Sequence, residues 1–144
     1  NYFLTPNPDM TLTVPAATEN VITFGGYDNV TNAFYPKSGR GFTRENRIKP
    51  DMTAPAVNVY GPGISGGYTR RTGTSVACAL GAGACAQILQ WGIVEDNEPY
   101  MKNNYIKNYL IRGAERNRDI RYPSEQWGYG TINVFDSFLI LTRT

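Results

Sequence analysis

The feature that most constrains this chain is an apolar run that directly follows a Gly-Thr-Ser sequence. The run extends from Val76 to Trp91 and contains Gly81, Gly83 and five alanines. Small residues at this density weaken an isolated helix. They make sense in a buried central helix whose backbone is approached closely by neighbouring elements. The sequence therefore predicts such a helix, with Gly92 as its C-terminal cap.

The serine at the start of this run is a candidate nucleophile. Gly73-Thr74-Ser75-Val76-Ala77 places Ser75 at the N-terminus of the predicted helix. Unpaired amides and the helix dipole favour negative charge there, so an oxyanion that formed beside Ser75 Oγ would be stabilised. Alternatively, Thr74 or Ser75 is simply the N-cap of the helix, a common role for these residue types. The five residues alone leave both interpretations open.

The chain contains no histidine. A serine nucleophile of the triad type needs a general base, which is usually histidine. No Ser-His pair, Cys-His pair or Cys/His zinc site can therefore form within these residues. If Ser75 is a nucleophile, its base must come from polypeptide outside this sequence, and we expect the chain to be part of an enzyme.

Composition excludes several other classes of protein. The 144 residues are 41% apolar and 18% charged, which predicts one globular domain and no transmembrane span. The net charge of +2 gives no electrostatic reason to expect nucleic acid or a membrane surface as a partner. We see no signal peptide, and the missing initiator Met indicates a cut or processed end at residue 1. No loop concentrates carboxylates, so we expect no metal and no cofactor.

The two cysteines are predicted to remain free. Cys78 and Cys85 lie seven residues apart on the predicted helix, a rise of about 10.5 Å. A disulfide requires Cα atoms within roughly 7 Å of each other. We therefore expect both side chains to be small, buried hydrophobic groups.

The rest of the sequence predicts alternating strands, loops and helices. The expected order is a loop over 1–20, a buried parallel strand over 21–26, a polar surface loop over 27–49, short strands near Met52 and over 57–60, an antiparallel strand over 68–70, and helices over 100–111 and 133–141. Residues 61–66 match the dinucleotide-binding pattern G-x-G-x-x-G. The residues that follow cannot begin the helix which that mechanism requires, so a tight turn is predicted.

Four ordered segments resemble the subtilisin-like serine proteases over nearly the whole chain. Gly73-Thr74-Ser75-Val76-Ala77 is similar to the family's nucleophile signature, and Lys49-Pro50-Asp51-Met52-Thr53-Ala54-Pro55 to its K-P-D-x-x-A-P stretch. Residues 13–16 with 21–28 resemble a strand after the substrate-pocket region, and residues 127–134 resemble the segment before the final helix. Residues 38–41, 90–94 and 106–114 resemble the bacterial Csp-type subtilases more specifically. Ala79-Leu80 replaces the Pro-His of most members, which alters the subfamily without affecting the nucleophile.

The resemblance implies both a fold and a function. The implied fold is α/β: residues 1–144 would be the C-terminal portion of a three-layer subtilisin-like domain, with parallel strands, flanking helices and a buried central helix after the serine. Ser75 would be the catalytic nucleophile of a serine endopeptidase acting through an acyl-enzyme. Thr74 and the Ser75 amide would position the loop or bind the oxyanion, whereas the triad aspartate, the histidine and the oxyanion asparagine would lie upstream.

This interpretation also implies partners. Protein or peptide substrates and the N-terminal remainder of the same protein are expected, and this chain alone should be inactive. The alternative is a pseudoprotease whose subtilisin-like fold serves as a binding or regulatory module. The residues leave localisation open, and the resemblance implies a bacterial protein that is secreted or spore-associated.

Overall fold

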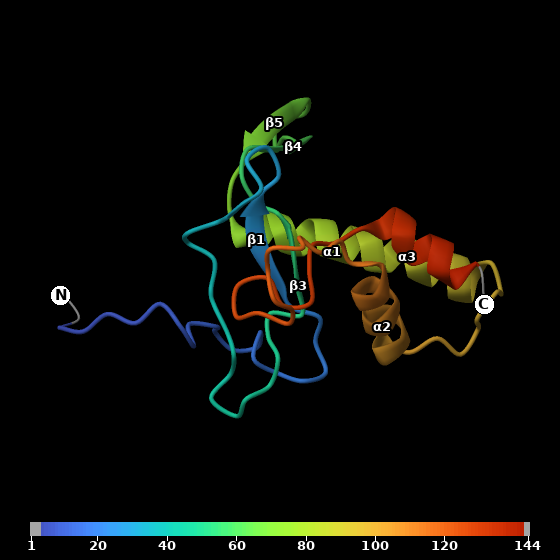
Figure 1. Cartoon of the computed structure of the whole chain (residues 1–144). Helices are drawn as coiled ribbons and strands as arrows, with labels where there is room; N and C mark the ends of the chain where they lie inside the picture. Colours follow the sequence, from blue (N-terminus) through green and yellow to red (C-terminus); the bar gives the residue numbers. More distant parts are fainter. Residues whose placement is uncertain (1–3, 143–144) are drawn as a thin grey trace.

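A small mixed sheet organises the fold. The computed structural model describes residues 4–142 (Figure 1). Strands β1 (Phe24–Asp28) and β3 (Met52–Pro55) pair in parallel, with Phe24 opposite Met52, and β2 (Ala33–Phe34) pairs antiparallel with the end of β1. The order is β2-β1-β3. The predicted α/β class and the parallel pairing are confirmed.

Strand β1 begins later than the sequence predicts. Residues 21–23 precede it, because the Thr23 amide donates to the Asp51 carboxylate at 2.7 Å instead of to a neighbouring strand. The segment 27–49, predicted as surface loop, contains β2 and also buries Ser38 and Lys49. The burial of Ser38 and Lys49 could not be predicted from alternating polarity, because both side chains are polar and are buried by forming hydrogen bonds.

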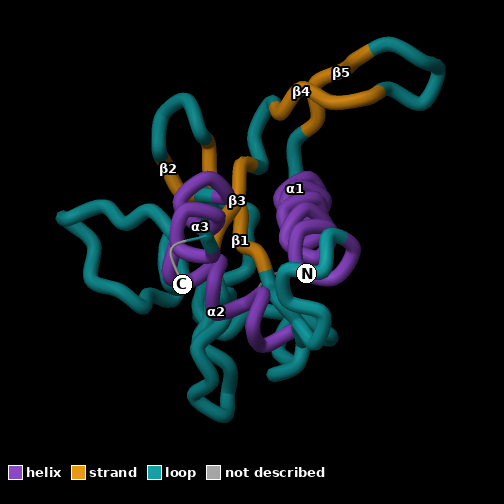
Figure 2. The backbone as a smooth tube through the Cα atoms, turned by 90° about the vertical axis from the view of Figure 1, so that its right-hand side faces the viewer, coloured by secondary structure: helices purple, strands orange, loops and turns teal. Residues whose placement is uncertain are grey.

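The next two strands form a hairpin that projects from the body of the molecule (Figures 1 and 2). β4 (Val59–Pro62) and β5 (Tyr68–Arg71) are antiparallel, and the turn between them uses Gly66 and Gly67 at φ 87° and 68°. No helix begins in this turn. The structure thus confirms that the G-x-G-x-x-G match is a tight turn.

Helix α1 (Thr74–Leu89) packs along β1 and β3 and continues into a π-helical turn, η1 (Gln90–Val94). Gly92 lies inside this turn, so its predicted role as C-cap is wrong. A side chain at Gly92 would come within 2.7 Å of the Met101 Cε atom. The end of the Met101 side chain thus packs against Gly92, and the glycine does not end the helix.

Burial of α1 is one-sided within the described residues. A Cβ on Gly81 would lie 2.2 Å from the Phe24 ring, whereas a Cβ on Gly83 would meet nothing within 4 Å. The described residues therefore do not bury the helix on all sides.

The segment Thr74–Val94 is also long and apolar enough to cross a membrane, and 28% of its apolar window is buried. Core helices of soluble proteins meet the same criterion of length and composition, and α1 packs on two strands as such helices do.

The two C-terminal helices pack on each other beside the far half of α1 (Figure 1). α2 spans Asn103–Gly113 and α3 spans Val134–Leu141, close to the predicted bounds. Gly113 ends α2 where a Cβ would lie 2.4 Å from Ser137 Oγ, so the helices cross closely. Asn133 caps α3 by accepting the Asp136 amide at 3.0 Å. The shared core comprises Met52, Ala84, Ile88, Met101, Ile106, Leu110 and Leu141.

A buried ion cluster joins the sheet to α2. Lys49 Nζ donates to Asp51 Oδ2 at 2.7 Å, and Lys107 Nζ lies 2.5 Å from Asp51 Oδ1. The side chains of Lys49 and Asp51 are 1% and 0% exposed. Burial lowers the pKa of Lys49, opposed by the adjacent Asp51 carboxylate. Because burying an unpaired charge is costly, this cluster fixes the segment before β3 against α2.

Candidate active site

The N-terminus of α1 is set by Gly73. This residue is the N-cap at φ 151°, a conformation that favours glycine, and no side chain caps the helix. The Gly73 amide donates to the Ala56 carbonyl at 2.8 Å, which ties the helix start to the chain after β3. Thr74 and Ser75 are therefore the first two helical residues, and the alternative that one of them is the N-cap is wrong.

Ser75 lies exposed at the start of the helix, as the nucleophile interpretation requires. Its hydroxyl forms no hydrogen bond within residues 4–142. Its amide belongs to the first turn, where no intrahelical acceptor exists. The Val76 amide, by contrast, donates to the Gly73 carbonyl at 3.0 Å. Ser75 thus combines a free hydroxyl with a free amide at the positive end of a 16-residue helix.

Thr74 is oriented toward the sheet. It is half-buried, and its Cγ2 atom would lie 3.5 Å from a Cβ on Gly26. The same Cβ would lie 2.6 Å from the Ala56 Cβ, so glycine at position 26 allows the chain after β3 to approach β1. Thr74 thus lies in van der Waals range of β1 beside this close approach.

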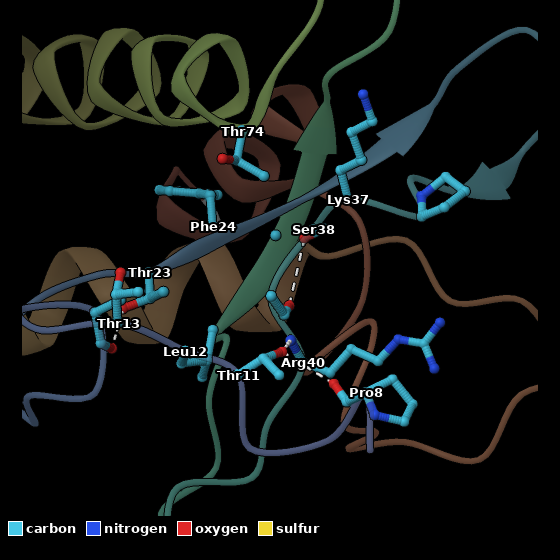
Figure 3. Close-up of a pocket in the computed structure, with 14 residues that line it drawn as sticks. Pro8, Thr11, Leu12, Thr13, Thr23, Phe24, Lys37, Ser38, Arg40 and Thr74 are labelled. Carbon is cyan, nitrogen blue, oxygen red and sulfur yellow. Dashed lines mark hydrogen bonds between the residues drawn. The ribbon is translucent and has the colours of Figure 1, made fainter. Parts of the chain in front are cut away.

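An open pocket of about 470 Å³ lies next to Thr74 (Figure 3). Its walls come from the N-terminal segment, the start of β1 and the loop over 36–40. Figure 3 shows Thr74 and Phe24 at one side of the hollow, with Leu12 and Arg40 across from them. Polar and apolar groups both line it.

The pocket adjoins an unpaired edge of β1. At Gly26 this edge is satisfied, because the amide donates to Ser38 Oγ and the carbonyl accepts from the Tyr35 amide, both at 3.0 Å. β3 pairs with Phe24 along the other edge of β1, and β2 pairs only with Tyr27 and Asp28. The edge beside Phe24 and Gly25, which both line the pocket, therefore has no partner among the described strands. The pocket also reaches Thr74, the residue before Ser75.

The cysteines remain free, as predicted, but Cys78 is exposed and Cys85 is half-buried. The expectation that both are buried is wrong for Cys78, because it lies on the face of α1 that no described residue covers. Burial raises the pKa of the Cys85 thiol. No group of three or more His, Cys, Asp or Glu residues that could hold a metal ion occurs in the described part of the chain.

The sequence did not reveal the buried Lys49–Asp51–Lys107 cluster. The Lys-Pro-Asp motif contains two of its members, and the pairing of an acid with a base two residues away was the available signal. Lys107 enters from α2, a contact that only the tertiary structure creates.

An exposed serine therefore begins a helix that packs on two parallel strands, and the comparisons with known proteins identify the family. The model of the Subtilase family matches residues 3–130, so the chain belongs to the subtilase family. The structure of the Clostridium perfringens CspB protease superposes with a TM-score of 0.91 at 37% identity, covering 97% of this chain and 30% of that one. The patellamide maturation protease PatA superposes with a TM-score of 0.74 at 26% identity, covering 95% and 48%.

Curated relatives give the same family. The mouse membrane-bound transcription factor site-1 protease is 30% identical over 138 residues, which is 92% of this chain and 12% of that protein. Serine protease AprX of Bacillus subtilis is 28% identical over 90% of this chain and 32% of its own length. The chain thus spans a third or less of these curated relatives. The resemblance to subtilases of the Csp type is confirmed.

Proposed function

We propose that this chain is the C-terminal portion of a subtilase catalytic domain and that Ser75 is its nucleophile. The complete protein is then a serine endopeptidase that acts on protein or peptide substrates. The observation that carries the proposal is the exposed, unbonded Ser75 hydroxyl at the N-terminus of α1.

The reaction follows from this geometry. Ser75 Oγ attacks the carbonyl carbon of the scissile peptide bond and gives its proton to an upstream histidine, which passes it to the departing amine. The negative charge on the carbonyl oxygen is met by the Ser75 amide at the positive helix end. Water then hydrolyses the acyl-enzyme and regenerates the hydroxyl. Thr74 acts as a positioning residue, because it holds the turn against Gly26.

The missing groups have a place to enter. The pocket beside Thr74 borders an unpaired edge of β1 and lies close to Ser75. We propose that upstream polypeptide occupies this space and supplies the histidine and a side-chain oxyanion donor. Residues 1–144 contain no histidine, so on their own they should not hydrolyse peptides.

The test is covalent labelling of the full-length protein with a fluorophosphonate. Such a reagent reacts with activated serines, so we expect one adduct, located on Ser75 by peptide mass spectrometry. Ser65 is a matched control, because it is an exposed serine in the β4–β5 turn and should stay unlabelled. Protein unfolded in urea should lose the reaction.

Two outcomes would overturn the proposal. A folded full-length protein that leaves Ser75 unlabelled would be a pseudoprotease, with this fold serving a binding role. Equal labelling of Ser65 and Ser75 would show that the helix end does not activate the hydroxyl.

A further inference from the structure

A second, smaller pocket lies between β1 and the segment over 115–131. It has a volume of about 210 Å³. Three aromatic residues line it, namely Tyr27, Tyr122 and Trp127. Because side chains alternate along a strand, Tyr27 faces away from Phe24 and Gly26, which contact α1. The pocket therefore lies on the opposite face of the sheet from Ser75.

The aromatic wall belongs to a larger aromatic cluster. Trp127 is 8% exposed, with its ring centroid 5.8 Å from Tyr27 and 5.9 Å from Phe34. The Arg40 guanidinium lies 5.4 Å from the centroid of Phe34, in cation–π geometry. Phe34 does not line the pocket, whereas Tyr27 and Trp127 do.

The pocket also carries an unbalanced negative charge. Glu115 lines it and forms no ion pair within residues 4–142. Burial and the Glu115 carboxylate together raise the pKa of Tyr27, which places that charge close to the phenol. No lysine or arginine lines the pocket. The neighbouring Arg116 is turned away, because it donates to the Ile111 and Tyr129 carbonyls at 2.7 and 2.8 Å.

We propose that this pocket binds an alkylammonium group, specifically the side chain of a lysine in a peptide. Aromatic rings attract an ammonium ion within about 6 Å, Glu115 supplies the opposite charge, and Ile120 offers an apolar contact for the aliphatic stem. The site is separate from the catalytic serine and would anchor a polypeptide at a distance from the bond being cut.

The experiment uses full-length protein carrying Ser75→Ala, so that no turnover occurs. Calorimetric titration with Nα-acetyl-lysine methylamide, whose side-chain ammonium group is free, should show binding. The uncharged Nα-acetyl-norleucine methylamide should bind at least tenfold more weakly. Glu115→Gln keeps the shape of the pocket and should weaken lysine binding about tenfold. Glu125→Gln is the matched control, because Glu125 is an exposed residue of the same segment that does not line the pocket.

Tyr122→Leu is a second variant that removes one aromatic wall and should also weaken lysine binding. Equal affinity for the lysine and norleucine probes, or unchanged lysine affinity in Glu115→Gln, would overturn the proposal. So would a full-length structure in which an apolar side chain of upstream polypeptide fills the pocket. Fluorophosphonate labelling of Ser75 in the Glu115→Gln protein should match wild type, so this proposal and the proposed protease function can fail separately.

Discussion

The two faces of helix α1 differ in what covers them. On one face Ala77, Gly81, Ala84 and Ile88 are buried against the sheet and the core. The other face carries Ser75, Cys78, Ala79, Ala82, Gly83 and Ala86 at helical spacing, and most of it is exposed. Small residues dominate both faces, although Ile88 on the covered face is large, and only the covered face is buried by described residues.

From this difference we infer that small residues on a helix face indicate close packing by another element, even where that element is not part of the described chain. At position 81 only glycine fits, because the Phe24 ring lies against the helix there. At position 83 no described residue comes close enough to require glycine. Ser75, the candidate nucleophile, lies at the N-terminal end of the uncovered face. In the proposed enzyme, the upstream polypeptide would have to approach α1 at this end.

The largest effect is expected at the head of the open face. Ser75→Ala in the full-length protein should lower kcat for peptide hydrolysis by about 10⁶-fold, the scale found for the serine in subtilisin. The measurement is cleavage of a fluorogenic peptide. Ser65→Ala should leave the rate unchanged, and residual activity above a thousandth of wild type in Ser75→Ala would contradict the assignment.

On the covered face, Gly81→Ala should destabilise the protein. The added Cβ would lie 2.2 Å from the Phe24 ring, and overpacking of this kind costs about 1–3 kcal/mol. Urea unfolding of the full-length protein measures the free energy. Adding Phe24→Leu should recover part of the loss, and a Gly81→Ala protein as stable as wild type would contradict the close contact.

On the open face, Gly83→Ala distinguishes a covered from an uncovered helix. Nothing lies within 4 Å of its added Cβ here, so a helix left open would gain up to about 1 kcal/mol from the better helix former. We expect the reverse in the full-length protein, because upstream polypeptide should pack against this face. A gain in the free energy of unfolding there would show that the face stays open.

The smallest effect concerns thiol reactivity. Cys78 lies on the open face, whereas Cys85 is half-buried with a raised thiol pKa and so holds less thiolate near neutral pH. In the full-length protein both thiols should react slowly with iodoacetamide relative to the urea-unfolded protein, as followed by mass spectrometry. Fast alkylation of Cys78 beside a protected Cys85 would mean that nothing covers the open face.

Much of the fold could be predicted from local pattern. The short strand near Met52, the hairpin ending in β5, and the helices over 100–111 and 133–141 all follow from periodicity and glycine placement, and all are found. Predictions of element boundaries were wrong where polar contacts or close packing between distant segments set the boundary. Thr23 bonds to Asp51 and delays β1, and Gly92 makes room for Met101 inside a π turn instead of ending α1.

The candidate site divides in the same way. Sequence alone indicated Ser75 as the candidate nucleophile, because its position at a helix N-terminus is encoded by adjacent residues. The absence of histidine predicts that any general base for this serine lies outside these residues. The aromatic pocket could not be predicted, because Tyr27, Glu115 and Trp127 come together only when β1 and the 115–131 segment meet.

The α/β class, the subtilase resemblance and the position of Ser75 could be read from the residues alone, because each rests on short motifs and on their order along the chain. Only the tertiary structure decided that Gly73 caps α1, that Lys107 joins the Lys49–Asp51 pair, and that one face of α1 is left open. These features depend on contacts between segments distant along the chain, and the local pattern of residues does not encode such contacts.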